Sequence, residues 1–119
     1  MKKYNIQNYI RYKEDVKQSV ARLEDKIWNE YTREELTVKF LPLVENIARK
    51  FSTSQQASGV MSIMDMIQSG SVGLVHAVRK LDYDKLTESE DMEKTLKSFF
   101  SKRIKGSIRR QIDSNRGSI

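Results

Sequence analysis

Apolar residues recur every three or four positions along most of the chain, with polar residues between them. This spacing gives each segment one apolar helical face, whereas a half-buried strand would alternate at every second position. Only one proline and five glycines interrupt the pattern. The sequence therefore predicts an all-α fold, a compact bundle of about five helices.

The first apolar stripe predicts a helix that continues to about Tyr31. Its buried positions would be Val16, Val20, Leu23, Ile27 and Tyr31. A second helix should begin after Thr32, because Thr32 and Glu35 have the spacing of a capping box. Its apolar positions are Leu36, Phe40, Leu43, Val44, Ile47, Ala48 and Phe51. Pro42 lacks an amide hydrogen and should kink or restart this helix near Phe40.

The middle of the chain predicts a hairpin of two short helices that follows a polar loop at 52–59. Ser62 and Asp65 repeat the capping-box spacing and should start the first of these helices. Residues 69–71 (Ser-Gly-Ser) are expected to break it, and the second helix is expected over 72–81. Its inner face would be Leu74, Val75, Val78 and Leu81, with Gly73 and Ala77 allowing close helix approach.

A final helix is expected after an acidic surface loop at 84–93. Its apolar positions are Leu96, Phe99, Phe100, Ile104, Ile108 and Ile112. Neighbouring helix positions point about 100° apart, so only one of Phe99 and Phe100 can readily enter the core. We expect Phe100 to be buried and Phe99 to be partly exposed. The alternative is that both phenylalanines are buried.

Positive charge is concentrated at one end of the chain. The formal net charge is +6, but residues 94–119 hold eight basic residues and one acid, a net +7. The preceding residues therefore sum to −1. Such one-sided charge is typical of a protein that binds phosphates.

Several classes of site have no counterpart in the sequence. There is no cysteine, and His76 is the only histidine, so a transition-metal site is not expected. We find no phosphate-binding glycine loop, no nucleophile paired with a base and no carboxylate pair, and we expect neither enzymatic activity nor a cofactor. No apolar run approaches the ~20 residues that span a bilayer. A cytoplasmic protein without a membrane partner is expected.

Three blocks, in this order, resemble region 2 of bacterial RNA polymerase sigma factors: LPLVENIARKF (41–51), DMIQSGSVGLVHAVRKLDYDK (65–85) and KRIKGSIRRQI (102–112). The middle block is similar to the family pattern DLIQEGNIGLIKAVDKFD. Ten of its positions match: Asp65, Ile67, Gln68, Gly70, Gly73, Leu74, Ala77, Val78, Lys80 and Asp82. The resemblance implies a polymerase-binding and promoter-melting domain at 36–119, with residues 1–35 as a helical segment packed on it.

The resemblance implies that the middle block binds core RNA polymerase, at the clamp coiled coil of the largest subunit. The implied contact residues are Met64, Asp65, Gln68, Ser71 and Val75. They combine apolar side chains with a few directional polar groups, as a docking surface requires. Without the resemblance, Asp65 would be interpreted as a helix cap and Gln68 as a solvated side chain.

The resemblance also implies that the final helix contacts promoter DNA, especially the non-template strand. The implied residues are Lys97, Phe99, Lys102, Arg103, Lys105, Arg109, Arg110 and Arg116. Phe99 stands where the family has the aromatic residue that stacks on a flipped base. Lys102 and Arg103 replace the tryptophan pair of primary sigma factors, and Gly106 replaces a base-reading glutamine. The helix is more similar to the stress, sporulation and flagellar types, whose pattern is near xxIxGEIxR and is followed here by Ile104, Gly106 and Ile108.

The function expected from this resemblance is a sigma-like initiation factor that recognises and melts the minus-ten promoter region. Two alternatives stay open: a polymerase-binding regulator or decoy without promoter reading, and a generic basic helical DNA-binding module. The connection at 84–95 is longer than the family spacing, and no upstream-element domain follows Ile119. We expect either a fragment or a factor whose upstream contacts come from a separate protein. A minimal factor of this kind would suit a bacteriophage and act in the host cytoplasm.

Overall fold

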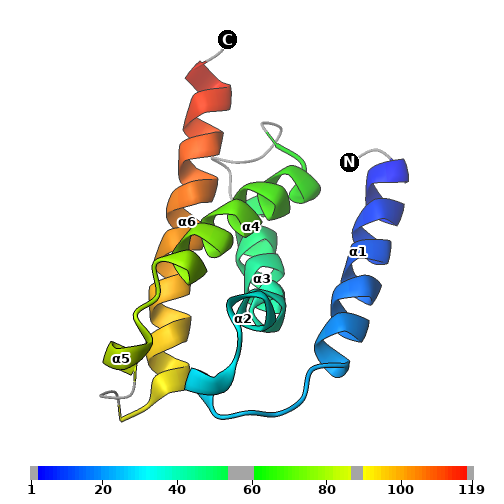
Figure 1. The fold of residues 1–119 in the computed structure, drawn as a ribbon. Helices are drawn as coiled ribbons and strands as arrows, with labels where there is room; N and C mark the ends of the chain where they lie inside the picture. The colour runs from blue at the N-terminus through cyan, green and yellow to red at the C-terminus, as the bar shows by residue number, and fades with distance from the viewer. Residues whose placement is uncertain (1–2, 54–60, 87–89, 118–119) are drawn as a thin grey trace.

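The computed structural model describes residues 3–53, 61–86 and 90–117 (Figure 1). These residues form six α-helices and one short 3₁₀ helix, and they contain no strand. This confirms the predicted all-α bundle. The elements are α1 (Lys3–Ala21), η1 (Trp28–Glu30), α2 (Arg33–Lys39), α3 (Leu41–Ser52), α4 (Ile63–Arg79), α5 (Tyr83–Leu86) and α6 (Met92–Gly117).

The core lies where α3, α4 and α6 meet. α6 packs most extensively against α4, and α3 contacts both of these helices. One face of α6 is buried along its length, through Leu96, Phe100, Ile104, Ile108 and Ile112. α1 contacts α2, α3 and α4, and Figure 1 shows it on the opposite side of the molecule from α6. The outer surface of α6 is therefore left open.

Both predicted capping boxes are present. At the start of α2, the Glu35 amide donates to the Thr32 hydroxyl and the Thr32 amide donates to the Glu35 carboxylate. Ser62 and Asp65 make the same reciprocal pair at the start of α4. The predicted restart at Pro42 is also confirmed, because α2 ends at Lys39 and α3 begins at Leu41.

The predicted hairpin at 62–81 is wrong, because α4 is continuous from Ile63 to Arg79. A Cβ atom on Gly70 would lie 3.0 Å from Val44 Cγ1 and 3.1 Å from Ile104 Cγ2. A Cβ atom on Gly73 would lie 2.8 Å from the Arg103 carbonyl oxygen and 2.8 Å from Ser107 Cβ. Both glycines are thus needed for close packing against α3 and α6. Neither of them makes a turn.

The predicted first helix is also wrong at its C-terminal end. α1 ends at Ala21, and Ile27 is 61% exposed. A continuing helix would direct the Lys26 amide to the Arg22 carbonyl, but this amide donates to the Tyr31 hydroxyl at 3.1 Å. Tyr31 is buried as expected, although it lies after η1 and outside α1.

Two predicted loops are described only in part. Ser52 still belongs to α3 and Thr53 follows it, whereas residues 54–59 lie outside the described residues. In the acidic stretch 84–93, α5 covers the beginning and residues 87–89 lie outside the description. Asp91 is exposed, and its carboxylate accepts from the Lys94 amide at 3.1 Å. At least one acid of this stretch therefore stabilises the start of α6.

A chain of aromatic contacts crosses the base of the bundle. The ring centroids are 5.8 Å apart for Trp28 and Phe40, 4.9 Å for Phe40 and Phe100, and 5.7 Å for Phe100 and Phe99. Phe100 is fully buried and Phe99 is half-buried, as predicted for these neighbours. The chain therefore runs from the η1 segment through the core to the surface of α6.

The proposed boundary at residue 35 falls inside α2. The assignment of residues 1–35 and 36–119 to separate roles stays a prediction. Among the described helices, none is both long enough and apolar enough to cross a bilayer.

Candidate functional site

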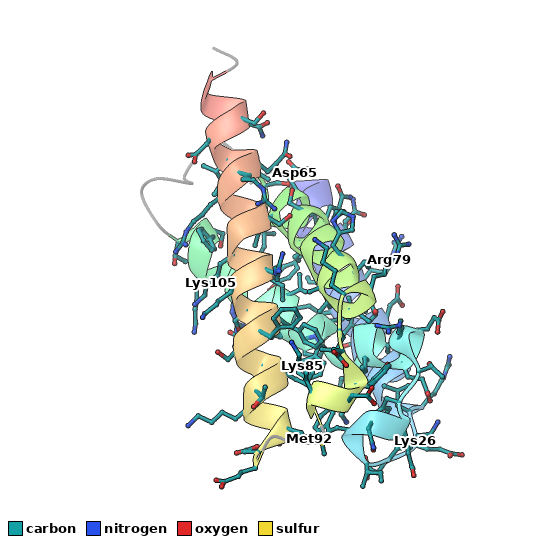
Figure 2. All side chains as sticks on the ribbon, turned by 60° about the vertical axis from the view of Figure 1, so that its left-hand side comes forward. Lys26, Asp65, Arg79, Lys85, Met92 and Lys105 are labelled. Atoms are coloured by element: carbon teal, nitrogen blue, oxygen red, sulfur yellow. The ribbon has the colours of Figure 1, made fainter. Side chains whose placement is uncertain are left out.

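The residues expected to bind polymerase all lie on α4. Asp65 and Gln68 are exposed, whereas Met64, Ser71 and Val75 are half-buried. The exposed stripe of α4 also contains His76, as expected for a surface or interface histidine, and two residues that were not predicted as site residues, Val72 and Arg79. Figure 2 shows Asp65 and Arg79 near opposite ends of the helix. The stripe therefore runs along most of α4.

Val72 is the most distinctive residue that was missed. It is 53% exposed and lies one helical turn from Gln68, with which it shares a face. The signal that could have found it is the four-residue spacing Gln68, Val72, His76 within one continuous helix. The expected break at 69–71 hid this spacing.

Asp65 has a structural role at the start of α4. Its Oδ2 atom accepts from the Ser62 amide at 3.3 Å, and its own amide donates to Ser62 Oγ at 3.1 Å. The helix-cap interpretation of Asp65 is therefore correct. Contact with a partner is a separate role, because the side chain remains exposed.

α1 packs beside one edge of this α4 surface. The Tyr12 hydroxyl is buried and makes no hydrogen bond of normal geometry, although it lies near Ser71. Burial raises the pKa of Tyr12. Tyr9 anchors α1 to α3 by donating to Glu45, whose carboxylate also lies 4.0 Å from Lys13 Nζ. Ser71 is thus the least accessible polar residue of the expected contact set.

The basic residues expected to bind DNA project from α6, but they do not share one face. Lys97, Lys102, Arg103, Lys105, Arg109 and Arg110 are exposed. Arg116 is part of α6, although its side chain lies outside the description. The Arg103 guanidinium lies 5.5 Å from the Phe99 ring centroid, and that of Arg109 lies 5.7 Å from the ring centroid of Phe51 on α3. The cations therefore occupy two flanks of the helix.

α3 adds cations to the flank of α6 that contains Arg109. Its last turn contains Arg49 and Lys50, both exposed, directly before Phe51. Arg49 is 3.9 Å from Glu45, and its guanidinium donates to Asn46. Neither residue was predicted as a site residue, because both are distant from α6 along the chain.

Phe99 lines a pocket of about 280 Å³ at the other flank. The pocket lies between the C-terminal end of α4 and the first turns of α6. Its other lining residues are Lys80, Leu81, Asp82, Lys85, Thr95 and Leu96. Leu81 and Leu96 are buried, so the half-buried Phe99 is the apolar residue that can contact the face of a planar ring. Lys80 and Lys85 are exposed and can contact an anion. These properties suit an unstacked base attached to its phosphate.

The described residues contain no cluster of three His, Asp or Glu side chains that could bind a metal ion. His76 is exposed on α4. Comparison of the chain with protein-family models, curated proteins and solved structures finds no match. The assignment to sigma factors therefore stays a resemblance, and the roles that it implies stay predictions.

Proposed function

We propose that this protein is a sigma-like transcription initiation factor. Its α4 surface binds core RNA polymerase, and α6 recognises and melts the minus-ten region of a promoter. The observation that carries the proposal is the tight packing of α4 on α6 through Gly70 and Gly73. This packing fixes two surfaces relative to each other. One is the mixed polar and apolar surface of α4, and the other is the cationic and aromatic surface of α6.

The α4 surface has the composition of a docking site. Val72 provides an exposed apolar centre, while Gln68 and Asp65 provide directional polar groups. Met64 and Val75 extend the apolar area along its edge. A helical partner such as the clamp coiled coil could pack against such a ridge through its own side-chain grooves.

The α6 surface has the two properties that strand separation requires. Lysine and arginine bind phosphates without regard to sequence, and a stacked aromatic contributes about 1–3 kcal/mol per unpaired base. Phe99 is half-buried and lines a pocket, while Arg103 lies over its ring. Phosphate binding and base capture would therefore occur side by side.

The docking proposal can be tested by co-purification with core polymerase. Gln68→Ala combined with Val72→Lys changes the exposed stripe without affecting the Ser62–Asp65 capping box. We expect this double variant to lose polymerase binding. Charge reversal at Asp65 is less informative, because it also removes the carboxylate that accepts from the Ser62 amide.

Ser62→Ala is the matched control. This change removes the Ser62 hydroxyl from the same capping box. It should cost about 1 kcal/mol of stability and leave the exposed stripe of α4 intact. We expect Ser62→Ala to bind polymerase like the wild type. Undiminished binding by the Gln68 and Val72 double variant would exclude α4 as the docking surface.

Promoter recognition can be tested by run-off transcription with core polymerase on a library of randomised promoters. The proposal predicts that transcripts made with the protein are enriched in one promoter motif. Polymerase binding without enrichment would instead support a regulator or decoy. DNA binding without polymerase binding would support a generic DNA-binding module.

A further inference from the structure

Gly106, in the middle of α6, has no packing role. A Cβ atom added at Gly70 or Gly73 would meet neighbours at 2.8–3.3 Å, whereas a Cβ atom at Gly106 would meet nothing within 4 Å. Glycine weakens a helix interior because it loses more backbone freedom than alanine on folding. Folding alone would therefore favour a larger residue at this position. Gly106 itself is half-buried, but no neighbouring atom occupies the place of its missing side chain.

Cationic side chains surround this position. Lys102 and Arg103 precede Gly106 by one turn, and Arg109 and Arg110 follow it by one turn, so all four share its neighbourhood on the helix. All four are exposed. The outer surface of α6 therefore has a position without a side chain, with positive charge on both sides of it along the helix axis.

Two of these arginines are held away from Gly106 by aromatic rings. Arg103 lies over Phe99 of α6, and Arg109 lies over Phe51 of α3. Their positions on α6 are separated by about 9 Å along the helix axis. Figure 2 shows Lys105, the residue before Gly106, on the side of α6 away from α4. The space directly above the Gly106 main chain is thus left open between the anchored cations.

We propose that Gly106 is the floor of a notch that binds the sugar-phosphate backbone of a DNA strand. The strand crosses α6 in direct contact with the helix main chain, and Arg103 and Arg109 bind its phosphates from the two sides. A side chain at position 106 would lift the strand away from these cations and weaken the attraction. This assignment rests on the proposed function, which supplies DNA as the ligand.

The test is Gly106→Ala in the full chain, measured by thermal unfolding and by DNA affinity. The variant should unfold about 4 °C higher than the wild type, because alanine favours the helix. Its affinity for DNA should nevertheless fall about three- to tenfold. Gly106→Leu should lower the affinity further, because its side chain fills more of the notch.

Ser98→Ala is the matched control, since Ser98 is exposed on the same helix two turns before Gly106. It should raise the unfolding temperature slightly and leave the DNA affinity unchanged. The probes are a duplex and a single strand of the same sequence. Their binding is measured by fluorescence anisotropy at low salt. A larger loss with the duplex would place double-stranded DNA in the notch, and a larger loss with the single strand would place the melted strand there.

A further variant separates failure of the notch from failure of the proposed function. Combined Lys102→Ala and Arg110→Ala removes charge without filling the notch. If this variant loses affinity while Gly106→Ala binds like the wild type, the notch is excluded and DNA binding by α6 stands. If the wild-type protein binds neither probe, either alone or together with core polymerase, both proposals are wrong.

Discussion

Phe99 and Phe100 are adjacent in the sequence but belong to different environments. Phe100 is fully buried between Phe40 and Phe99, so Phe100→Ala should reduce the free energy of unfolding by about 3–5 kcal/mol. Phe99→Ala should cost much less, because the ring is half-buried. Urea unfolding of the two variants measures this difference. Equal losses would contradict the assignment of Phe99 to the surface.

Phe99 has a second expected effect, on transcription. Phe99→Ala should slow the formation of open complexes on duplex promoters, because the flipped base loses its stacking partner. On a template that is already melted, the variant should act like the wild type. An equal defect on both templates would count against the stacking role.

Tyr9 makes the attachment of α1 dependent on pH. Partial burial and the hydrogen bond to Glu45 raise the pKa of Tyr9 from its usual value of 10.0 to about 12. The folded state thus holds this proton more tightly than the unfolded chain does. Its contribution to stability is complete below pH 10.0 and is lost as the pH rises through about 12.

Tyr9→Phe removes this contribution. We therefore expect the stability difference between wild type and variant to be largest below the unfolded-state pKa of Tyr9 and to shrink at higher pH. Urea unfolding across the alkaline range measures it. A difference that is independent of pH would show that Tyr9 is not coupled to Glu45 in solution.

At the scale of the helices, the two glycines of α4 should respond differently to alanine. Gly73→Ala places a methyl group against the Arg103 carbonyl oxygen, which is backbone and cannot move alone. Overpacking of this kind costs about 1–3 kcal/mol, against about 1 kcal/mol gained in helix propensity. Gly70→Ala meets only side-chain methyl groups, which can shift.

Gly73→Ala should therefore be the more destabilising of the two variants, as measured by urea unfolding. Because the Arg103 carbonyl belongs to α6, the change should also disturb the position of Phe99. If both variants are as stable as the wild type, α4 and α6 are further apart in solution than the structure indicates.

The starts of helices were predictable because their signals are local. Thr32 with Glu35 and Ser62 with Asp65 fix two starts, and Pro42 fixes a third. The Ser-Gly-Ser stretch of α4 was misinterpreted because a turn glycine and a packing glycine have the same local sequence. Only the approach of α3 and α6 distinguishes them, and that contact is not visible from the sequence of α4.

The candidate site was predictable to a similar extent. The helical period separated Phe100 from Phe99, and the charge count located the cations on α6. The sequence did not show that Arg103 and Arg109 turn to opposite flanks, because Phe51 comes from a different helix. The contribution of Arg49 and Lys50 was missed for the same reason.

DNA binding should depend steeply on salt, since cations are concentrated on α6. Each phosphate contact contributes about 0.7 to the slope of log affinity against log salt for a single strand. Lys102→Ala with Arg110→Ala should therefore reduce that slope by about 1.4. Anisotropy titrations at several salt concentrations measure this change.

The double variant Lys17→Ala and Arg22→Ala is the control, because it changes the net charge by the same amount as Lys102→Ala with Arg110→Ala. Both residues are exposed on or just after α1, on the opposite side of the molecule from α6 (Figure 1). This variant should keep the wild-type slope. If the two pairs reduce the slope equally, binding depends on total charge and has no defined surface on α6.

The aromatic chain also gives the protein an optical reporter. Trp28 is the only tryptophan, and its ring lies 5.3 Å from the Lys39 ammonium. The rings of Phe40 and Phe100 separate it from Phe99, so a ligand at the α6 surface would not touch the indole. A change in tryptophan emission when DNA binds at the α6 surface would therefore report that the segment between α1 and α2 has moved.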